Sequence, residues 1–166
     1  MLTYQVCDFD DLQLLIAEED GHIVFVGRHP EFGGAVTMKN LNTPLIEACR
    51  RQVGEYLAGE RQVFDLPIAF TGTPFAQRVY RALIQVPYGE LVSYQWLAEQ
   101  VGSHPRPVGT AVGNNPLLLI VPCHRVLGKH SLGGFSAGME LKYRLLELEG
   151  HTLRADKKDL AQPLAR

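Results

Sequence analysis

Long apolar runs, paired cysteines and nucleotide-binding glycine motifs are all missing from this chain of 166 residues. No stretch approaches the roughly 18 apolar residues of a membrane-spanning helix, and residues 1–10 lack the basic and apolar regions of a signal peptide. No metal-binding cluster or cofactor motif is present. We therefore expect a cytoplasmic protein without metal, without cofactor and without a membrane partner.

Cysteine is scarce as well. Cys7, Cys49 and Cys123 are odd in number, lie far apart and form no C-x-x-C pair. This spacing argues against a disulfide framework and against a four-cysteine zinc site. Reduced thiols fit a reducing compartment, and 46% hydrophobic with 20% charged residues is the composition of a folded globular protein.

The small net charge of −2 hides an uneven distribution. Residues 1–70 contain five Lys/Arg against eleven Asp/Glu, a balance of −6, whereas residues 71–166 contain eleven against seven, a balance of +4. Any contact with a polyanion is therefore expected in the second part of the chain.

The first part of the chain predicts a hairpin followed by a helix. Short apolar runs at Leu12–Ala17 and Ile23–Val26 flank Asp20-Gly21, a turn pair that favours positive φ. Thr43-Pro44 then supplies an N-cap and a proline at the first helical position. Apolar residues follow at helical spacing, and Cys49 lies among them, which predicts a core position.

The second part predicts several helices. A linker with a proline and a glycine, residues 64–72, separates it from the acidic first part. Thr73-Pro74 repeats the cap-and-proline start, and Ser93 is the expected N-cap of the next helix, which ends at Gly102. A turn of only three residues separates this helix from a further short helix over Pro105–Gly113. Two helices joined by such a turn are typical of a helix-turn-helix.

A continuous apolar run, Leu117–Val121, predicts a buried strand that leads into Pro122–Val126. Cys123 is then adjacent in sequence to His124 and Arg125. A thiolate is the reactive form of cysteine, and a nearby base or positive charge lowers the thiol pKa toward the physiological range. Cys123 is therefore the candidate nucleophile. A structural cysteine beside a surface histidine also fits this pair, because neighbours on a strand point to opposite faces.

Longer motifs extend from about Leu57 to Gly150. They are Leu57–Glu60, Phe64–Pro67, Thr73–Phe75, Ile84–Glu90, Ser93-Tyr94, Arg106–Gly109, Gly113–Pro116, Pro122–Val126 and Leu145–Gly150. In these motifs the chain resembles the O6-alkylguanine-DNA alkyltransferase family, and Pro-Cys-His-Arg-Val after Asn-Pro is highly specific. A related non-catalytic subgroup lacks the cysteine, so Cys123 argues against membership in that subgroup.

The resemblance implies an α/β (α+β) fold with two domains. A small ribonuclease-H-like domain with an antiparallel sheet and a helix is expected over residues 1–68. A mostly helical DNA-binding and alkyltransferase domain is expected over residues 69–150, with its last helix at Met139–Glu149. Residues 151–166 would form a tail, for which no function is predicted.

The resemblance also implies the chemistry, which is DNA repair by transfer of an alkyl group from O6 of guanine to Cys123. The transfer would happen once, because water cannot reverse a thioether. His124 would take the thiol proton through a water molecule, and Glu149 would hold the imidazole in the required tautomer. Tyr94 would donate a proton to the guanine ring, and Asn115 would brace the turn before the cysteine.

Double-stranded DNA containing O6-alkylguanine is the expected partner of a monomeric protein, and activity on O4-alkylthymine and the preferred alkyl size are left open. The target base must be flipped out of the stack, and Arg106 would fill the gap. The implied DNA-contacting residues are Arg106, Tyr94, Gly109, Ala111 and Arg125. The implied pocket residues are Val126, Phe135, Ser136 and Ala137.

Three residues depart from the family pattern. Pro107 stands where alanine is usual, and because a proline disfavours the helical region for the residue before it, the backbone of Arg106 is in question. Phe135 stands where some relatives have tyrosine, which removes a hydroxyl group. Ala137 replaces a usual glycine and narrows the lip of the pocket by one methyl group.

Two other classes of function stay open. A helix-turn-helix module that binds DNA without chemistry would keep every activity after Cys123→Ala. A Cys-His hydrolase would turn over activated esters through an acyl intermediate that water releases.

Overall fold

A computed structural model describes residues 2–28, 38–129 and 131–154. The chain divides into two compact units. The N-terminal unit is residues 1–71 with 116–119, and the C-terminal unit is residues 72–115 with 120–166. In the described part of the chain, no helix combines the length and apolar character needed to cross a membrane.

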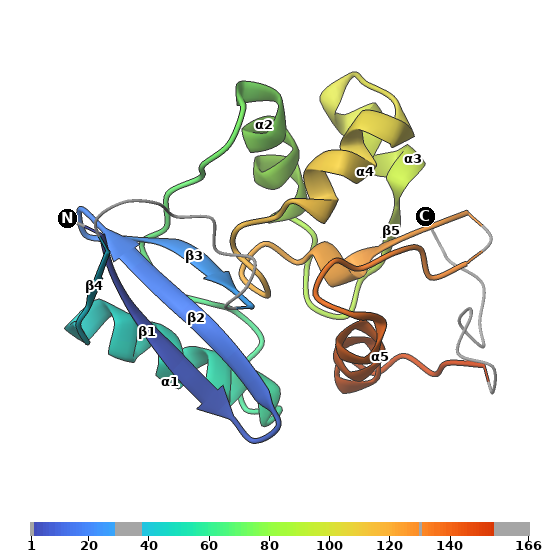
Figure 1. The fold of residues 1–166 in the computed structure, drawn as a ribbon. Coiled ribbons are helices and arrows are strands. Elements are labelled where there is room, and N and C mark those ends of the chain that lie inside the picture. Colours follow the sequence, from blue (N-terminus) through green and yellow to red (C-terminus); the bar gives the residue numbers. More distant parts are fainter. Residues whose placement is uncertain (1, 29–37, 130, 155–166) are drawn as a thin grey trace. The chain divides into compact units, whose positions relative to one another are not determined.

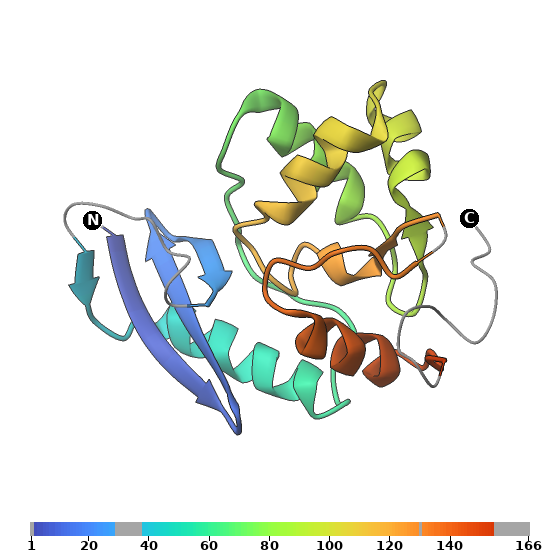
Figure 2. The same ribbon diagram turned by 45° about the vertical axis from the view of Figure 1, so that its right-hand side comes forward.

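A four-stranded sheet and one helix make up the N-terminal unit (Figure 1). The elements are β1 (Leu2–Phe9), β2 (Leu12–Glu19), β3 (His22–Gly27), β4 (Met38–Asn40) and α1 (Pro44–Leu57). The strand order is β3-β2-β1-β4, with β1 antiparallel to β2, β2 antiparallel to β3, and β4 parallel to β1. Helix α1 packs along the sheet, as Figure 2 shows. The expected antiparallel pairing and helix are confirmed.

Local sequence accounts for the turn and the cap in this unit. Strands β2 and β3 confirm the expected hairpin, and Asp20 and Gly21 at its tip have φ of 51° and 77°. Helix α1 begins after Thr43, whose hydroxyl accepts the N–H of Ile46 at 3.1 Å. Cys49 on α1 is fully buried, as predicted. No sequence pattern predicted β1 or β4.

Helices dominate the C-terminal unit. Its elements are α2 (Pro74–Leu83), β5 (Val92–Ser93), α3 (Tyr94–Val101), α4 (Pro105–Gly113), the 3-10 turn η2 (Cys123–Arg125), β6 (Val126–Leu127) and α5 (Met139–Leu148). Helices α2, α3 and α4 pack against one another, β5 and β6 pair in parallel, and α5 contacts η2 (Figures 1 and 2). The mixed α/β class expected from the sequence is therefore confirmed.

The predicted helix-turn-helix spacing is present in α3 and α4. Helix α3 ends at Gly102, whose φ of 66° is the left-handed conformation that glycine adopts easily. Helix α4 contains both Arg106 and Pro107. Pro107 lies in the first turn, where backbone N–H groups have no acceptor within the helix, so it does not interrupt α4. Pro107 therefore leaves Arg106 within the helix.

The predicted strand over Leu117–Val121 is wrong. Leu117 bridges to Val26, and the N–H of Leu118 donates to the Val26 carbonyl at 2.9 Å. The chain then turns at Leu119, where φ is 73°, a region that a non-glycine residue rarely adopts. The run is buried throughout. A continuous apolar run thus reports burial and not an extended backbone.

Candidate active site

Cys123 begins the turn η2 and is 4% exposed. Its N–H donates to the carbonyl of Val121 at 2.8 Å. The side-chain amide of Asn115 donates to the same carbonyl, also at 2.8 Å. Because Asn115 follows the end of α4, this shared acceptor ties the second helix of the helix-turn-helix to the turn that carries the thiol.

His124 and Glu149 form a buried pair. Nε2 of His124 lies 2.6 Å from Oε2 of Glu149, and the two side chains are 0% and 1% exposed. Burial lowers the pKa of His124, an effect that the hydrogen bond to Glu149 opposes but does not overcome. The imidazole is therefore neutral at neutral pH. Its proton lies on Nε2, facing the carboxylate, which leaves the lone pair on Nδ1.

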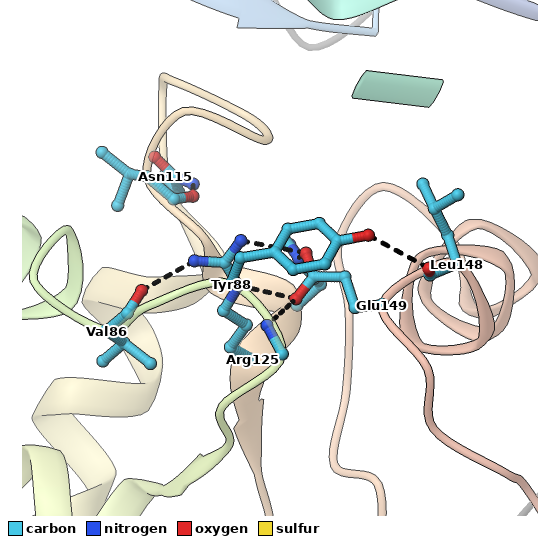
Figure 3. A network of polar contacts seen from close by, with 9 residues as sticks. Val86, Tyr88, Asn115, Arg125, Leu148 and Glu149 are labelled. Carbon is cyan, nitrogen blue, oxygen red and sulfur yellow. Dashed lines mark hydrogen bonds and ion pairs between the residues drawn. The ribbon is translucent and has the colours of Figure 1, made fainter. Parts of the chain in front are cut away.

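Arg125 is turned into the protein. Its Nε and Nη2 donate to the two oxygens of Glu149 at 2.9 and 3.0 Å, and Nη1 donates to the carbonyl of Val86 at 2.7 Å (Figure 3). Its side chain is 8% exposed. The expectation that Arg125 contacts DNA is therefore weakened, because protein acceptors inside the fold already engage its guanidinium.

Lys142 on α5 is a second buried cation and is not among the predicted site residues. Its ammonium donates to the carbonyls of Val126, Leu132 and Gly134 at 2.9, 2.5 and 3.0 Å. Burial lowers the pKa of Lys142 to about 8. These bonds join α5 to β6 and to the loop that follows β6. The sequence spacing could have identified Lys142, because this residue precedes Glu149 by seven positions and so shares its helix face.

Tyr94, the first residue of α3, packs between two glycines. A Cβ atom at Gly133 would lie 3.0 Å from Cε2 of Tyr94, and one at Gly109 would lie 3.8 Å from the ring. Burial, followed by the charge of Cys123, raises the pKa of Tyr94. The phenol therefore keeps its proton at neutral pH. Cys123 interacts electrostatically with Lys142 as well.

A pocket of about 900 Å³ opens beside Tyr94. Its lining is formed by Ser93, Tyr94, Gln95, Pro105, Arg106, Gly109, Lys129 and Gly134. Of the predicted DNA-contacting residues, Tyr94, Arg106 and Gly109 come together here, and Arg106 is exposed. Ala111 is 6% exposed, and its carbonyl accepts the hydroxyl of Tyr80 at 2.9 Å. Ala111 therefore joins α4 to α2 within the core.

The four predicted pocket residues lie outside this lining. The carbonyl of Val126 accepts from Lys142, and the ring of Phe135 lies 5.8 Å from the same ammonium. Ala137 is buried, whereas Ser136 is exposed. The structure thus places Val126 and Phe135 around the Lys142 ammonium, next to the pocket residue Gly134.

The other thiols and the possible metal ligands do not form a second centre in the described ranges. Cys7 and Cys49 are buried, and burial raises the pKa of both, for Cys49 to about 12. None of the three cysteines forms a disulfide bond. Within residues 2–28, 38–129 and 131–154, no cluster of His, Cys, Asp and Glu could hold a metal ion.

The fold and the site together define a class: a helix-turn-helix protein with a buried thiol beside a His–Glu pair. The model of the family "6-O-methylguanine DNA methyltransferase, DNA binding domain" matches residues 74–151. The constitutive methylated-DNA–protein-cysteine methyltransferase of Bacillus subtilis is 42% identical over 146 residues, which are 82% of this chain and 88% of that protein.

Two further comparisons agree. The methylated-DNA–protein-cysteine methyltransferase of Metallosphaera sedula is 46% identical over 105 residues, which are 63% of this chain and 67% of that protein. The crystal structure of Mycobacterium tuberculosis OGT in complex with DNA has a TM-score of 0.81 and 35% identity, and the match covers 89% of this chain and 92% of that one. The chain belongs to the methylated-DNA–protein-cysteine methyltransferase family, as its motifs predicted.

Proposed function

We propose that this chain repairs DNA by moving the alkyl group of O6-alkylguanine onto Cys123. The observation that carries the proposal is the 42% identity over 82% of the chain to a methylated-DNA–protein-cysteine methyltransferase. Cys123 is supported as the acceptor because the residue that follows it, His124, forms a buried pair with Glu149. Its two companions, Cys7 and Cys49, have raised pKa values and therefore stay protonated.

The reaction is a displacement at carbon. The sulfur of Cys123 forms a bond to the alkyl carbon while the bond from that carbon to O6 breaks, and the electron pair goes to the guanine. His124 accepts the thiol proton on Nδ1, through a water molecule, because Nε2 is engaged by Glu149. Tyr94 donates a proton to the guanine as negative charge builds there, and its raised pKa means that the phenol carries this proton at neutral pH.

The product ends the activity of the molecule. An S-alkyl thioether lacks an activated carbonyl, so water does not release the group and the thiol is not regenerated. Each protein therefore repairs one base. A free thiol is consumed in the process, which fits the cytoplasm as the compartment, and the reaction needs only one copy of the chain.

The protein binds DNA through the helix-turn-helix of α3 and α4. The O6 atom lies inside the base stack, so the nucleotide is flipped into the pocket beside Tyr94 at a cost of a few kcal/mol. Arg106 fills the vacated position. Its place in the first turn of α4 and on the pocket rim supports this role.

Intact mass spectrometry after incubation with duplex DNA containing O6-methylguanine tests the proposal. We expect a gain of one methyl group, located on Cys123 by peptide mapping, and no further turnover. Cys123→Ala should gain nothing, while Cys49→Ala should react like the parent protein. Repeated turnover, or methylation of Cys7 or Cys49, would contradict the proposal. A Cys123→Ala variant that keeps every activity would indicate a DNA-binding module.

A further inference from the structure

Four hydrogen bonds converge on the two carboxylate oxygens of Glu149. Oε1 accepts from Nε of Arg125 at 2.9 Å and from the N–H of Gly89 at 3.0 Å. Oε2 accepts from Nε2 of His124 at 2.6 Å and from Nη2 of Arg125 at 3.0 Å. A carboxylate offers about four acceptor positions. Its orientation toward His124 is therefore determined by the other donors, of which Arg125 supplies two.

The motif Ile84–Glu90 is part of the family resemblance, but no role was predicted for it. It supplies further contacts to the cluster formed by His124, Arg125 and Glu149. The carbonyl of Val86 accepts from Arg125 at 2.7 Å, and the Tyr88 ring lies 5.7 Å from the guanidinium carbon. The Tyr88 hydroxyl donates to the carbonyl of Leu148 at 3.1 Å, next to Glu149 (Figure 3). The turn between α2 and β5 therefore encloses the Arg125–Glu149 pair.

We propose that Arg125 is a positioning residue of the alkyl transfer: it fixes the Glu149 carboxylate so that His124 stays neutral and aligned to take the thiol proton. This inference rests on the proposed function. It assigns Arg125 to proton transfer instead of DNA contact, and it gives the 86–89 turn a role in the chemistry.

The charges around His124 determine in which direction its pKa should change when Arg125 is replaced. Glu149 faces it from the end of α5, Lys142 from the same helix, and Arg125 from η2. Burial lowers the pKa of His124 most, Glu149 raises it, and Arg125 and Lys142 lower it further. Removing the positive charge of Arg125 raises the pKa of His124, so a larger fraction of the imidazole is protonated in weak acid and cannot act as a base.

Two variants separate position from charge. Arg125→Gln removes the charge, and Arg125→Lys keeps it but loses the two parallel bonds to Glu149. Each variant should react more slowly than the parent, roughly tenfold to a hundredfold, because part of the general-base contribution is lost. For a given variant the factor should be the same with free O6-benzylguanine as with duplex DNA containing O6-methylguanine. Affinity for unmodified duplex should not change. For Arg125→Gln the loss should be greater at about pH 6 than at about pH 8.5.

Arg81→Gln is the matched control, because Arg81 is exposed on α2 and lies outside this cluster. A loss confined to duplex substrate, with weaker DNA binding, would overturn the proposal in favour of a DNA contact. An Arg125→Gln loss that is equal at every pH would also overturn it, because it indicates a structural role alone.

If Arg125→Gln does not fold, the ¹⁵N spectrum of the histidine ring in Arg125→Lys replaces its pH profile. A His124 ring with an unchanged Nε2–H signal would then overturn the proposal, whereas exchange between tautomers would support it. If the parent protein itself gains no methyl group, the proposed function fails. If the parent reacts and both variants match it, only the role of Arg125 fails.

Discussion

Cys49 in the N-terminal unit and Cys123 in the C-terminal unit are 0% and 4% exposed, yet their surroundings differ. Burial raises the pKa of Cys49 to about 12, and the nearby thiol of Cys7 adds to the shift. Cys123 belongs to a unit that buries His124, Arg125, Lys142 and Glu149. In the described part of the N-terminal unit, the buried polar side chain is Gln52. Burial alone therefore makes a thiol inert, and buried ionisable groups are needed to move its proton.

Removing the buried carboxylate of Glu149 should make the surroundings of Cys123 resemble those of Cys49. Glu149→Gln leaves Arg125 without its charged partner, so we expect a loss of about 3–5 kcal/mol in the free energy of unfolding. Alkyl transfer should slow by about 100-fold to 10,000-fold, the range of general-base catalysis. Urea unfolding and single-turnover kinetics measure the two effects. Glu147→Gln, an exposed position on α5, is the control, and equal behaviour of both variants would contradict the prediction.

The buried ammonium of Lys142 should make the free energy of unfolding depend on pH. Its pKa is about 8 in the folded protein against 10.5 for the ordinary group, so between these values the unfolded chain holds a proton that the folded protein has lost. The free energy of unfolding should therefore rise with pH across this window, by up to about 3 kcal/mol. Lys142→Met removes this contribution. Urea unfolding of both proteins across the window checks it, and a constant difference between them would refute the low pKa.

Arg106→Ala tests whether DNA engagement is separable from chemistry within the C-terminal unit. Reaction with duplex substrate should slow about tenfold to a hundredfold, because part of the cost of flipping is no longer offset. Reaction with free O6-benzylguanine needs no flipping and should stay near the parent rate. Arg78→Ala on α2 is the control. Equal loss on both substrates would place the effect of Arg106 in the pocket or in the fold.

Methylation of Cys123 should give the smallest effect. An added carbon in a packed site costs about 1–3 kcal/mol, and we expect the low end for methyl. In a chain of this length, a loss of about 1 kcal/mol lowers the melting temperature by about 2–4 °C. Melting curves of the free and fully methylated protein provide the measurement. A methylated form that melts at or above the free form would show that the site absorbs the group without strain.

The helix boundaries could be predicted because their determinants are local. Thr43, Thr73 and Ser93 each accept a backbone N–H three residues later, and Gly102 adopts the left-handed conformation that ends α3. The backbone conformation of Leu117–Val121 could not be predicted from neighbouring residues. Its conformation depends on a bridge to Val26, which is far away in the sequence.

Where a motif names the residues, the structure brings His124 and Glu149 together, as expected from the sequence. Arg125 was assigned to DNA through the family resemblance, and its sequence neighbours do not indicate that it is buried. Its partner lies 24 residues away, and only the fold brings the two together. The spacing of Lys142 and Glu149 was a periodic signal, but a lysine among apolar helix positions is normally expected to extend its ammonium to solvent.

Two adjacent glycines have opposite consequences for protein engineering. At Gly133, with φ of 72°, a side chain would be strained and would press on Tyr94. At Gly134, which lines the pocket, a Cβ atom would meet nothing within 4 Å. Variation at position 133 should therefore be selected against, whereas a library at position 134 offers a way to retune which adducts enter while the thiol and its proton acceptor stay in place.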